Sequence, residues 1–210
     1  MASSRMPVAA RTVAITARTR LASRVSANGR PRPLRTFVCQ PIGRQMHIRS
    51  ETSSDEEAIS ALITTAFLEA EHRGGDEAKI VEALRRAGKL AVSLVATQDQ
   101  SILGHVGFSP VLINGKDLGW FGLAPVAVMP GHQRKGIGTA LIKAGLTTLN
   151  EKGASGCVVL GEPAYYSRFG FIADPALQLA GIPPEYFLRV ALRGQPCSGK
   201  VLFHPAFGVG

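Results

Sequence analysis

A regular pattern of apolar and polar positions begins at Met46. Residues 46–51 alternate as a short strand does, and apolar residues then recur every three or four positions, as on the buried face of a helix. Ser53 and Glu56 have the spacing of a capping box, which predicts the start of that helix, and Arg73-Gly74-Gly75 predicts its end. We therefore expect a strand followed by a helix.

A second helix precedes a series of strands. Asp76 is placed to cap this helix and Gly88 to end it. Three β-like segments follow, at about residues 91–96, 102–113 and 118–128. Asn114-Gly115 predicts a hairpin between the last two segments, because both positions of such a turn need positive φ. Pro125 lacks the N–H that a strand ladder uses, so we expect the pairing to break or bulge there.

The last third of the chain returns to alternating helices and strands. Its predicted elements are a helix from about Gly138 to Gly153, a buried strand at Gly156–Leu160, helical turns at Tyr165–Phe169 and a strand at Leu188–Arg193. Lys200–His204 is a candidate to pair beside that last strand. The order β-α-α-β-β-β-α-β-α-β indicates an α/β fold with a mixed central sheet flanked by helices.

Charge separates the chain into two parts. Residues 1–45 contain nine arginines and no Lys, Asp or Glu, whereas residues 46–210 contain 15 basic and 15 acidic residues. Residues 46–210 therefore offer no net field that attracts nucleic acid or an anionic membrane, and we expect neither as a partner of this part.

The Arg-rich tail, residues 1–45, has three interpretations. It can result from a start assigned too far upstream, it can be a mitochondrial or plastid transit peptide, or it can be a disordered arm that grips phosphates. We favour the first, with Met46 as the native first residue, and otherwise expect the tail to be disordered. The expected location is the cytoplasm, or the mitochondrion or plastid if the tail is a genuine transit peptide.

Several classes of protein are excluded by what the chain lacks. No apolar run approaches 18 residues, so we expect no spanning helix. Cys39, Cys157 and Cys197 lie far apart with no CxxC motif, which argues against a disulfide scaffold and a cysteine zinc site. The five histidines show no metal-ligand spacing, so we expect no metal.

A glycine- and base-rich loop joins the strand that ends at Val128 to the following helix. Its sequence is Gln133-Arg134-Lys135-Gly136-Ile137-Gly138. Glycines let backbone N–H groups converge, and a helix N-terminus adds partial positive charge, so the loop can cradle an anion such as a pyrophosphate. It is neither a Walker A motif nor a complete dinucleotide fingerprint. An ordinary turn with two solvated cations is the alternative interpretation.

The same loop resembles the Q/R-x-x-G-x-G/A signature of the GNAT superfamily of acyl-CoA N-acyltransferases. The segment from Val126 to Pro130 extends the resemblance upstream, and Tyr165–Phe171 resembles the aromatic motif that closes the family's domain. Gly161–Tyr166 and His204–Phe207 resemble the YhbS-like group within this family. The resemblance covers about residues 46–210, which we therefore expect to form an N-acetyltransferase domain.

The resemblance implies that acetyl-CoA binds between two splayed parallel strands. Backbone groups of Val126, Ala127 and Val128 would meet the pantetheine arm and the thioester, and an N–H of Ala127 or Val128 would meet the developing oxyanion. The pyrophosphate would be bound by the loop and the start of the helix, at Gln133, Arg134, Lys135, Gly136, Ile137, Gly138 and Thr139.

The resemblance also suggests which side chains move protons. Tyr166 stands where the family's tyrosine protonates the departing thiolate; a packed aromatic is the alternative, and Tyr165 is expected to pack. Many members carry an acid on the strand that corresponds to residues 118–128, but Trp120–Val128 contains none. Glu162, which follows the strand Gly156–Leu160 near the expected thioester, is our first choice for the general base; a helix-capping or loop acid is the alternative.

Other candidates for the base are weaker. Glu69, Glu71 and His72 end the first predicted helix, in a region that often lines the acceptor pocket in the family, although a solvated helix end explains them as well. His105 and His132 are isolated in the sequence, and each is expected to be a strand-packed or a surface histidine.

The predicted function is acetyl-CoA-dependent N-acetyltransfer to a primary amine, by direct transfer in a ternary complex. The acceptor would be a small molecule or a peptide, and the protein a monomer or a homodimer. A second hypothesis is a non-catalytic acetyl-CoA-binding sensor or partner module, which the missing strand acid motivates. A third is a nucleic-acid-associated protein that uses residues 1–45.

Overall fold

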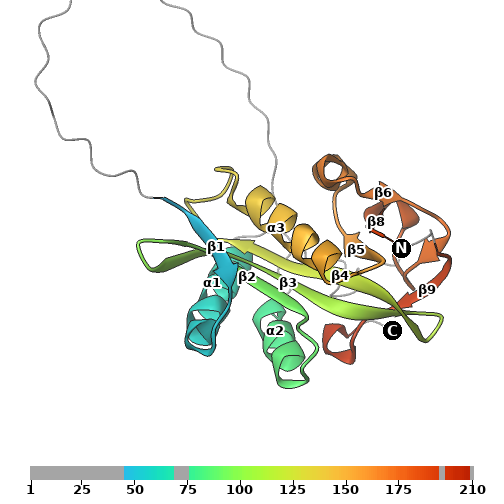
Figure 1. The fold of residues 1–210 in the computed structure, drawn as a ribbon, viewed down its shortest axis with the longest axis horizontal. Coiled ribbons are helices and arrows are strands. Elements are labelled where there is room, and N and C mark those ends of the chain that lie inside the picture. Colours follow the sequence, from blue (N-terminus) through green and yellow to red (C-terminus); the bar gives the residue numbers. More distant parts are fainter. Residues whose placement is uncertain (1–44, 69–75, 194–196, 209–210) are drawn as a thin grey trace, which may run out of the picture.

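The computed structural model describes residues 45–68, 76–193 and 197–208 (Figure 1). The predicted tail lies outside these residues except for Gln45, and so do Glu69, Glu71 and His72. None of the helices in the described part is long and apolar enough to cross a membrane.

Nine strands and four helices make up the described part, with short 3-10 turns between them. The strands are β1 (His47–Ser50), β2 (Val92–Gln98), β3 (Ser101–Ile113), β4 (Lys116–Val128), β5 (Gly156–Leu160), β6 (Ile172–Ala173), β7 (Leu177–Gln178), β8 (Phe187–Ala191) and β9 (Gly199–Leu202). The helices are α1 (Glu56–Leu68), α2 (Glu77–Arg86), α3 (Ile137–Glu151) and α4 (Pro163–Tyr166), and the turns are η2 (Ser53–Asp55), η3 (Ser167–Phe169), η4 (Pro184–Tyr186) and η5 (Pro205–Phe207).

The strands form a mixed sheet in the order β1-β2-β3-β4-β5-β8-β6. Strands β1 to β4 pair antiparallel, β4 and β5 pair parallel, and β5 and β8 pair antiparallel. Helix α3 covers one face of the sheet, whereas α1 and α2 cover the other (Figure 1). The predicted α/β fold with a mixed, helix-flanked sheet is confirmed.

Each helix packs on the sheet through the stripe that its sequence predicts. In α3, Leu141, Ile142 and Leu149 are buried against the strands, and Gly145 leaves the space that the Phe108 ring fills. On the other face of the sheet, α1 packs on Val95 and Ala127. Its buried residues in this cluster are Ile59, Leu62, Ile63 and Phe67. The two sides of β4 therefore face different helices.

The predicted irregularity at Pro125 is confirmed. Val106 of β3 pairs with Val126, but Phe108 pairs with Leu123, so Ala124 and Pro125 together lie opposite the single residue Gly107. This two-against-one arrangement is a β-bulge.

The predicted capping box was wrong by one residue. Thr52 precedes the first turn, and its backbone N–H donates to Asp55 Oδ2 at 2.8 Å, whereas Ser53 and Glu56 are exposed. Asp55 takes the capping position because Arg49 of β1 holds its side chain there. Arg49 donates to both Asp55 carboxylate oxygens, at 2.6 and 2.9 Å. A contact between separate elements thus decides the position of the cap.

The expected pairing of Lys200–His204 beside the strand at Leu188–Arg193 was also wrong. Strand β9 pairs with β3 at Leu112 and Ile113, and with the short strand β7. Both edges of β8 are already occupied, by β5 and β6, whereas β3 extends beyond the end of β2. After β9, the ring of Phe203 packs directly on Gly122 of β4, where a Cβ would overlap it.

Candidate active site

A gap opens between β4 and β5. The two strands pair from Trp120 with Gly156 to Gly122 with Val158, although β4 continues to Val128 and β5 to Leu160. Among the described strands, none pairs with this side of β4 beyond Gly122. The predicted splay of the parallel strands is therefore present, and it lies next to the bulge at Pro125.

The backbone of β4 turns two of the three predicted residues toward the gap. The Met129 N–H donates to the Leu103 carbonyl on β3 at 2.9 Å. Since successive residues of a strand direct their backbone groups to opposite sides, Ala127 also faces β3, whereas Val126 and Val128 face the gap. The Val128 carbonyl accepts a hydrogen bond from Gln133 Nε2 at 3.2 Å, which ties the loop to the end of the strand.

The loop and the first turn of α3 present unpaired backbone donors. Arg134 and Gly136 have φ values of 61° and 86°, so the chain turns sharply just before the helix. The first bond of α3 runs from the Ala140 N–H to the Gly136 carbonyl at 2.9 Å. The N–H groups of the three residues before Ala140 therefore have no carbonyl within the helix to bind, and they carry its partial positive charge.

The side chains of this loop leave the turn open. Gln133, Arg134, Lys135 and Gly136 are exposed, and a Cβ on Gly136 would meet only open space. We call residues 133–139 the cradle. Its exposed cations and unpaired N–H groups are the features on which the predicted anion site depends, and the binding of an anion here stays a prediction.

Tyr166 lies at the centre of an aromatic group on α4. It is fully buried, and its ring packs edge-on against Tyr165 and Phe171, with centroid distances of 5.0 and 5.7 Å. Its hydroxyl is buried without a hydrogen-bond partner among the described residues. Burial raises the pKa of Tyr166 well above its usual value, so the hydroxyl keeps its proton at neutral pH.

Tyr165 joins α4 to the start of α3. Its hydroxyl lies 3.4 Å from the position that a Cβ on Gly138 would take, and the Arg168 guanidinium lies 4.6 Å above its ring. Tyr165 thus packs as a buried residue of the main hydrophobic cluster, at the point where that cluster meets the cradle.

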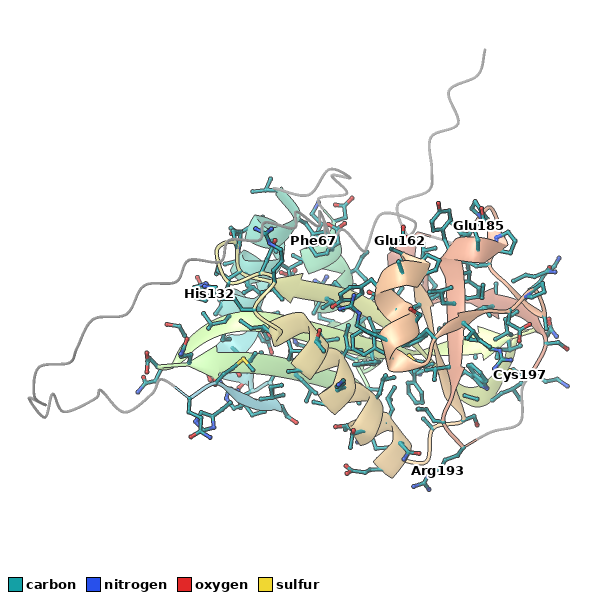
Figure 2. All side chains as sticks on the ribbon, turned by 90° about the horizontal axis from the view of Figure 1, so that it is seen from above. Phe67, His132, Glu162, Glu185, Arg193 and Cys197 are labelled. Carbon is teal, nitrogen blue, oxygen red and sulfur yellow. The ribbon has the colours of Figure 1, made fainter. Side chains whose placement is uncertain are left out.

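Glu162 stands at the N-terminus of α4. Its carbonyl accepts the N–H groups of Tyr165 and Tyr166 at 3.0 and 3.1 Å, and its exposed side chain makes no capping bond within the described residues. Glu162 and Phe67, near the end of α1, lie along the same side of the molecule (Figure 2). The carboxylate is therefore open to solvent rather than packed beside the Tyr166 hydroxyl.

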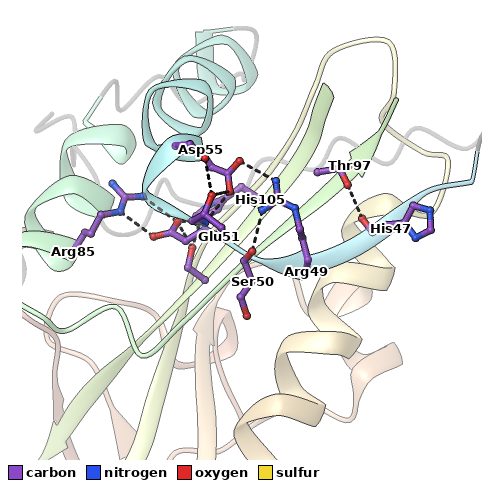
Figure 3. Close-up of polar contacts among 11 residues, drawn as sticks. His47, Arg49, Ser50, Glu51, Asp55, Arg85, Thr97 and His105 are labelled. Carbon is purple, nitrogen blue, oxygen red and sulfur yellow. Dashed lines mark hydrogen bonds and ion pairs between the residues drawn. The ribbon is translucent and has the colours of Figure 1, made fainter. Parts of the chain in front are cut away.

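The two histidines that look isolated in the sequence have different surroundings. His132 lies partly exposed in the loop before the cradle, as expected for a surface histidine. His105 packs within β3 as expected, but it also contacts Ser93 and Glu51, two polar residues from other elements (Figure 3). No short-range signal connects these positions, which are 12 and 54 residues apart in the chain. In the described part, no group of three His, Cys, Asp or Glu side chains is arranged to hold a metal ion.

Comparisons with known proteins agree on one family. Residues 47–173 match the family model described as an acetyltransferase (GNAT) domain. The chain is 44% identical over 127 residues to the uncharacterized N-acetyltransferase YhbS of Escherichia coli K12, an alignment that covers 60% of this chain and 73% of that protein.

Two solved structures resemble the chain over most of its length. One is a GNAT family acetyltransferase from Brucella melitensis in complex with acetyl-CoA, at 43% identity and a TM-score of 0.71, covering 78% of this chain and 99% of that one. The other is YhbS from Escherichia coli in complex with CoA, at 36% identity and a TM-score of 0.73, covering 80% of this chain and 95% of that one.

Proposed function

This chain belongs to the GNAT acetyltransferase family, and from that premise we propose that it binds acetyl-CoA between β4 and β5 and acetylates a primary amine. The observation that carries the proposal is the unpaired edge of β4, which leads directly into the cradle at the start of α3. The Brucella melitensis relative, which was solved with acetyl-CoA, supports the choice of donor. We further propose that residues 46–210 form the catalytic domain and act in the cytoplasm.

The residues present fit the donor. Backbone groups of Val126 and Val128 face the gap and match the amide-rich pantetheine arm, while Ala127 is held by β3. The cradle offers its unpaired N–H groups and the cations of Arg134 and Lys135 to the pyrophosphate. Its members are Gln133, Arg134, Lys135, Gly136, Ile137, Gly138 and Thr139.

Acetyl-CoA supplies an activated acetyl group when it is bound. We assign the Tyr166 hydroxyl to give its proton to the departing sulfur, because it is protonated at neutral pH and has no other partner among the described residues. We assign the Val128 N–H, rather than that of Ala127, to hydrogen-bond the thioester carbonyl oxygen, because the backbone of Val128 faces the gap. Glu162 is one candidate to take the proton from the amine, which would attack directly without a covalent enzyme intermediate.

Turnover with acetyl-CoA tests this function. The full chain, and a chain begun at Met46, are incubated with acetyl-CoA and a panel of small amines and peptides, and released thiol is measured. We expect at least one amine to give turnover. Calorimetric CoA binding without turnover on any amine would favour a sensor, and failure to bind CoA would exclude both.

Changing Tyr166 to Phe tests the acid. We expect turnover to fall about 10- to 1000-fold, because the departing sulfur loses its proton donor, while CoA affinity stays the same. Tyr186→Phe is the matched control, because Tyr186 is an exposed tyrosine in η4. Unchanged turnover in the Tyr166 variant would remove this hydroxyl from the mechanism.

A further inference from the structure

A partly buried polar cluster lies on the face of the sheet that α1 and α2 cover. We call Glu51, Arg85, Ser93 and His105 the relay cluster (Figure 3). They come from the residue after β1, from α2, from β2 and from β3. The function described above does not use this cluster, and the acid of β4, Asp117, lies at the far end of the strand, so that Trp120–Val128 carries no side chain that could act as a base.

Hydrogen bonds connect the cluster from one end to the other. Arg85 Nε and Nη2 donate to the two carboxylate oxygens of Glu51 at 2.9 and 3.0 Å. Ser93 Oγ donates to Glu51 Oε2 at 2.5 Å and lies 2.8 Å from His105 Nε2. His105 is fully buried, and its Nδ1 has no hydrogen-bond partner among the described residues.

These bonds determine where the imidazole proton lies. Despite its burial, hydrogen bonds from the cluster lower the pKa of Glu51 to about 2, so its carboxylate only accepts. The single hydroxyl hydrogen of Ser93 goes to Glu51, and Ser93 Oγ must therefore accept from His105 Nε2–H. Burial lowers the pKa of His105, so the ring is neutral and has one N–H. Its Nδ1 then carries a free lone pair.

The free nitrogen does not share the direction of Nε2. The two ring nitrogens of an imidazole point in well-separated directions, and Nε2 lies 2.8 Å from Ser93 Oγ on β2. The next strand on the other side is β4, where Ala127 pairs with His105 and contributes to the cluster packed under α1. Ala127 lies between Val126 and Val128, the two residues whose backbone faces the gap.

We propose that His105 Nδ1 accepts, through one bridging water, the proton that the amine releases as it attacks the acetyl group; this inference rests on the proposed function. The amine N–H bond breaks as its nitrogen bonds the acetyl carbon, and the C–S bond breaks as sulfur takes the Tyr166 proton. His105 then loses this proton to solvent and the Tyr166 oxygen regains one from solvent, which restores both groups for the next turnover. Ser93 and Glu51 act as positioning residues, which fix the tautomer and stabilise the imidazolium.

The charges around His105 are suited to this role. Glu51 favours the protonated ring through Ser93, while burial and the Arg85 charge oppose it. Glu56 of α1 faces Arg85 at 3.8 Å on the solvent side of the cluster. The α1 side chains over the sheet are the apolar Ile59, Leu62 and Ile63, and β4 contributes Ala127. Burial is the largest of these influences and keeps the resting ring neutral, while the Glu51 carboxylate stabilises the imidazolium that forms when Nδ1 takes a proton.

The test compares His105→Gln with wild type in the full chain. A glutamine amide can still donate to Ser93, but it cannot take a proton. With acetyl-CoA and the best amine of the panel, we expect kcat to fall at least about 100-fold and the acid limb of its pH profile to disappear. The KM for acetyl-CoA and the CoA affinity should not change. His47→Gln is the control, since His47 is an exposed histidine of β1.

Three further measurements separate this role from a structural one. Ser93→Ala should shift the acid limb to lower pH, because it disconnects the carboxylate that stabilises the imidazolium. Glu162→Gln tests the rival base, and loss of the acid limb there but not in His105→Gln would overturn the proposal. Nitrogen-15 NMR of the labelled chain should show Nε2–H and a bare Nδ1 on His105 near pH 7.

The outcomes are distinguishable from failure of the proposed function. A wild-type chain that binds CoA but acetylates no amine overturns both the function and this role. A wild-type chain that turns over while His105→Gln keeps its rate and pH profile overturns the role of His105 alone. An Nδ1–H tautomer would do the same without any activity measurement.

Discussion

The cradle and the relay cluster lie on either side of β4 and are built in opposite ways. The cradle is exposed from Gln133 to Gly136, comes from one continuous segment, and offers backbone N–H groups beside solvated cations. The relay cluster is partly buried, comes from four separate segments, and consists of side chains that mostly satisfy one another. The cradle should therefore be sensitive to backbone conformation, and the relay cluster to the loss of any one side chain.

The largest expected effect is the removal of Glu51. Glu51→Ala leaves the Arg85 charge and the Ser93 hydroxyl with their partner gone, so we expect the free energy of unfolding to fall by about 3 kcal/mol. Urea denaturation measures this. The control is Lys79→Ala, which breaks an exposed ion pair with Asp76 and should cost less than about 0.5 kcal/mol. Equal losses of unfolding free energy in Glu51→Ala and Lys79→Ala would contradict the proposed difference between the relay cluster and an exposed ion pair.

The pH dependence of the free energy of unfolding also tests the contribution of Glu51, with a smaller expected effect. The pKa of Glu51 falls from 4.5 to about 2 on folding, so its stabilisation is fully present above pH 4.5 and is lost as the pH falls toward 2. The stability gap between wild type and Glu51→Ala should therefore narrow over this range. Denaturation curves recorded from pH 6 downward check it, and a constant gap would show that the ionised carboxylate contributes nothing.

Next in size is a backbone change in the cradle. Gly136 has a φ of 86°, where an alanine costs about 1–2 kcal/mol, and relief of that strain would redirect the N–H groups. We expect Gly136→Ala to weaken CoA binding about 10-fold in calorimetry. Gly115→Ala is the matched control, because Gly115 has a φ of 76° in the β3–β4 hairpin, away from the cradle. Unaltered CoA affinity in the Gly136 variant would count against the cradle as the pyrophosphate site.

The smallest expected effect is the loss of a cradle side chain. Arg134→Ala or Lys135→Ala should each weaken CoA binding about threefold, and less at high salt, because exposed charges are screened. Lys116→Ala, in the hairpin, removes the same kind of exposed charge as a control. A loss as large as that of Gly136→Ala would mean that the cations, and not the backbone, hold the anion.

What the sequence predicts correctly in this molecule is local. Asn114-Gly115 takes the positive φ values of 51° and 76° that its hairpin needs, and Gly136 turns the chain before α3. Pro125 produces the bulge because a missing N–H acts at its own position. Each of these outcomes depends on the residue itself and on its immediate neighbours.

What the sequence could not predict depends on contacts between distant segments. The capping residue is Asp55 because Arg49, which lies in β1, binds its carboxylate. Strand β9 pairs with β3 because the end of β3 at Leu112 and Ile113 has no partner in β2. His105 looked isolated because Glu51 and Ser93 reach it only in the folded chain. The catalytic assignments of Tyr166 and Glu162 stay predictions, which the variants described above can test.

The position of Phe203 has a mechanical consequence. Its ring lies on Gly122, the last residue of β4 that pairs with β5, and the strand before it is fastened to β3. The segment after β9 therefore packs on β4 at the residue where β4 and β5 separate. A motion that widens the gap between β4 and β5 is therefore resisted at Gly122, where the Phe203 ring and the pairing of β9 with β3 hold the strands together.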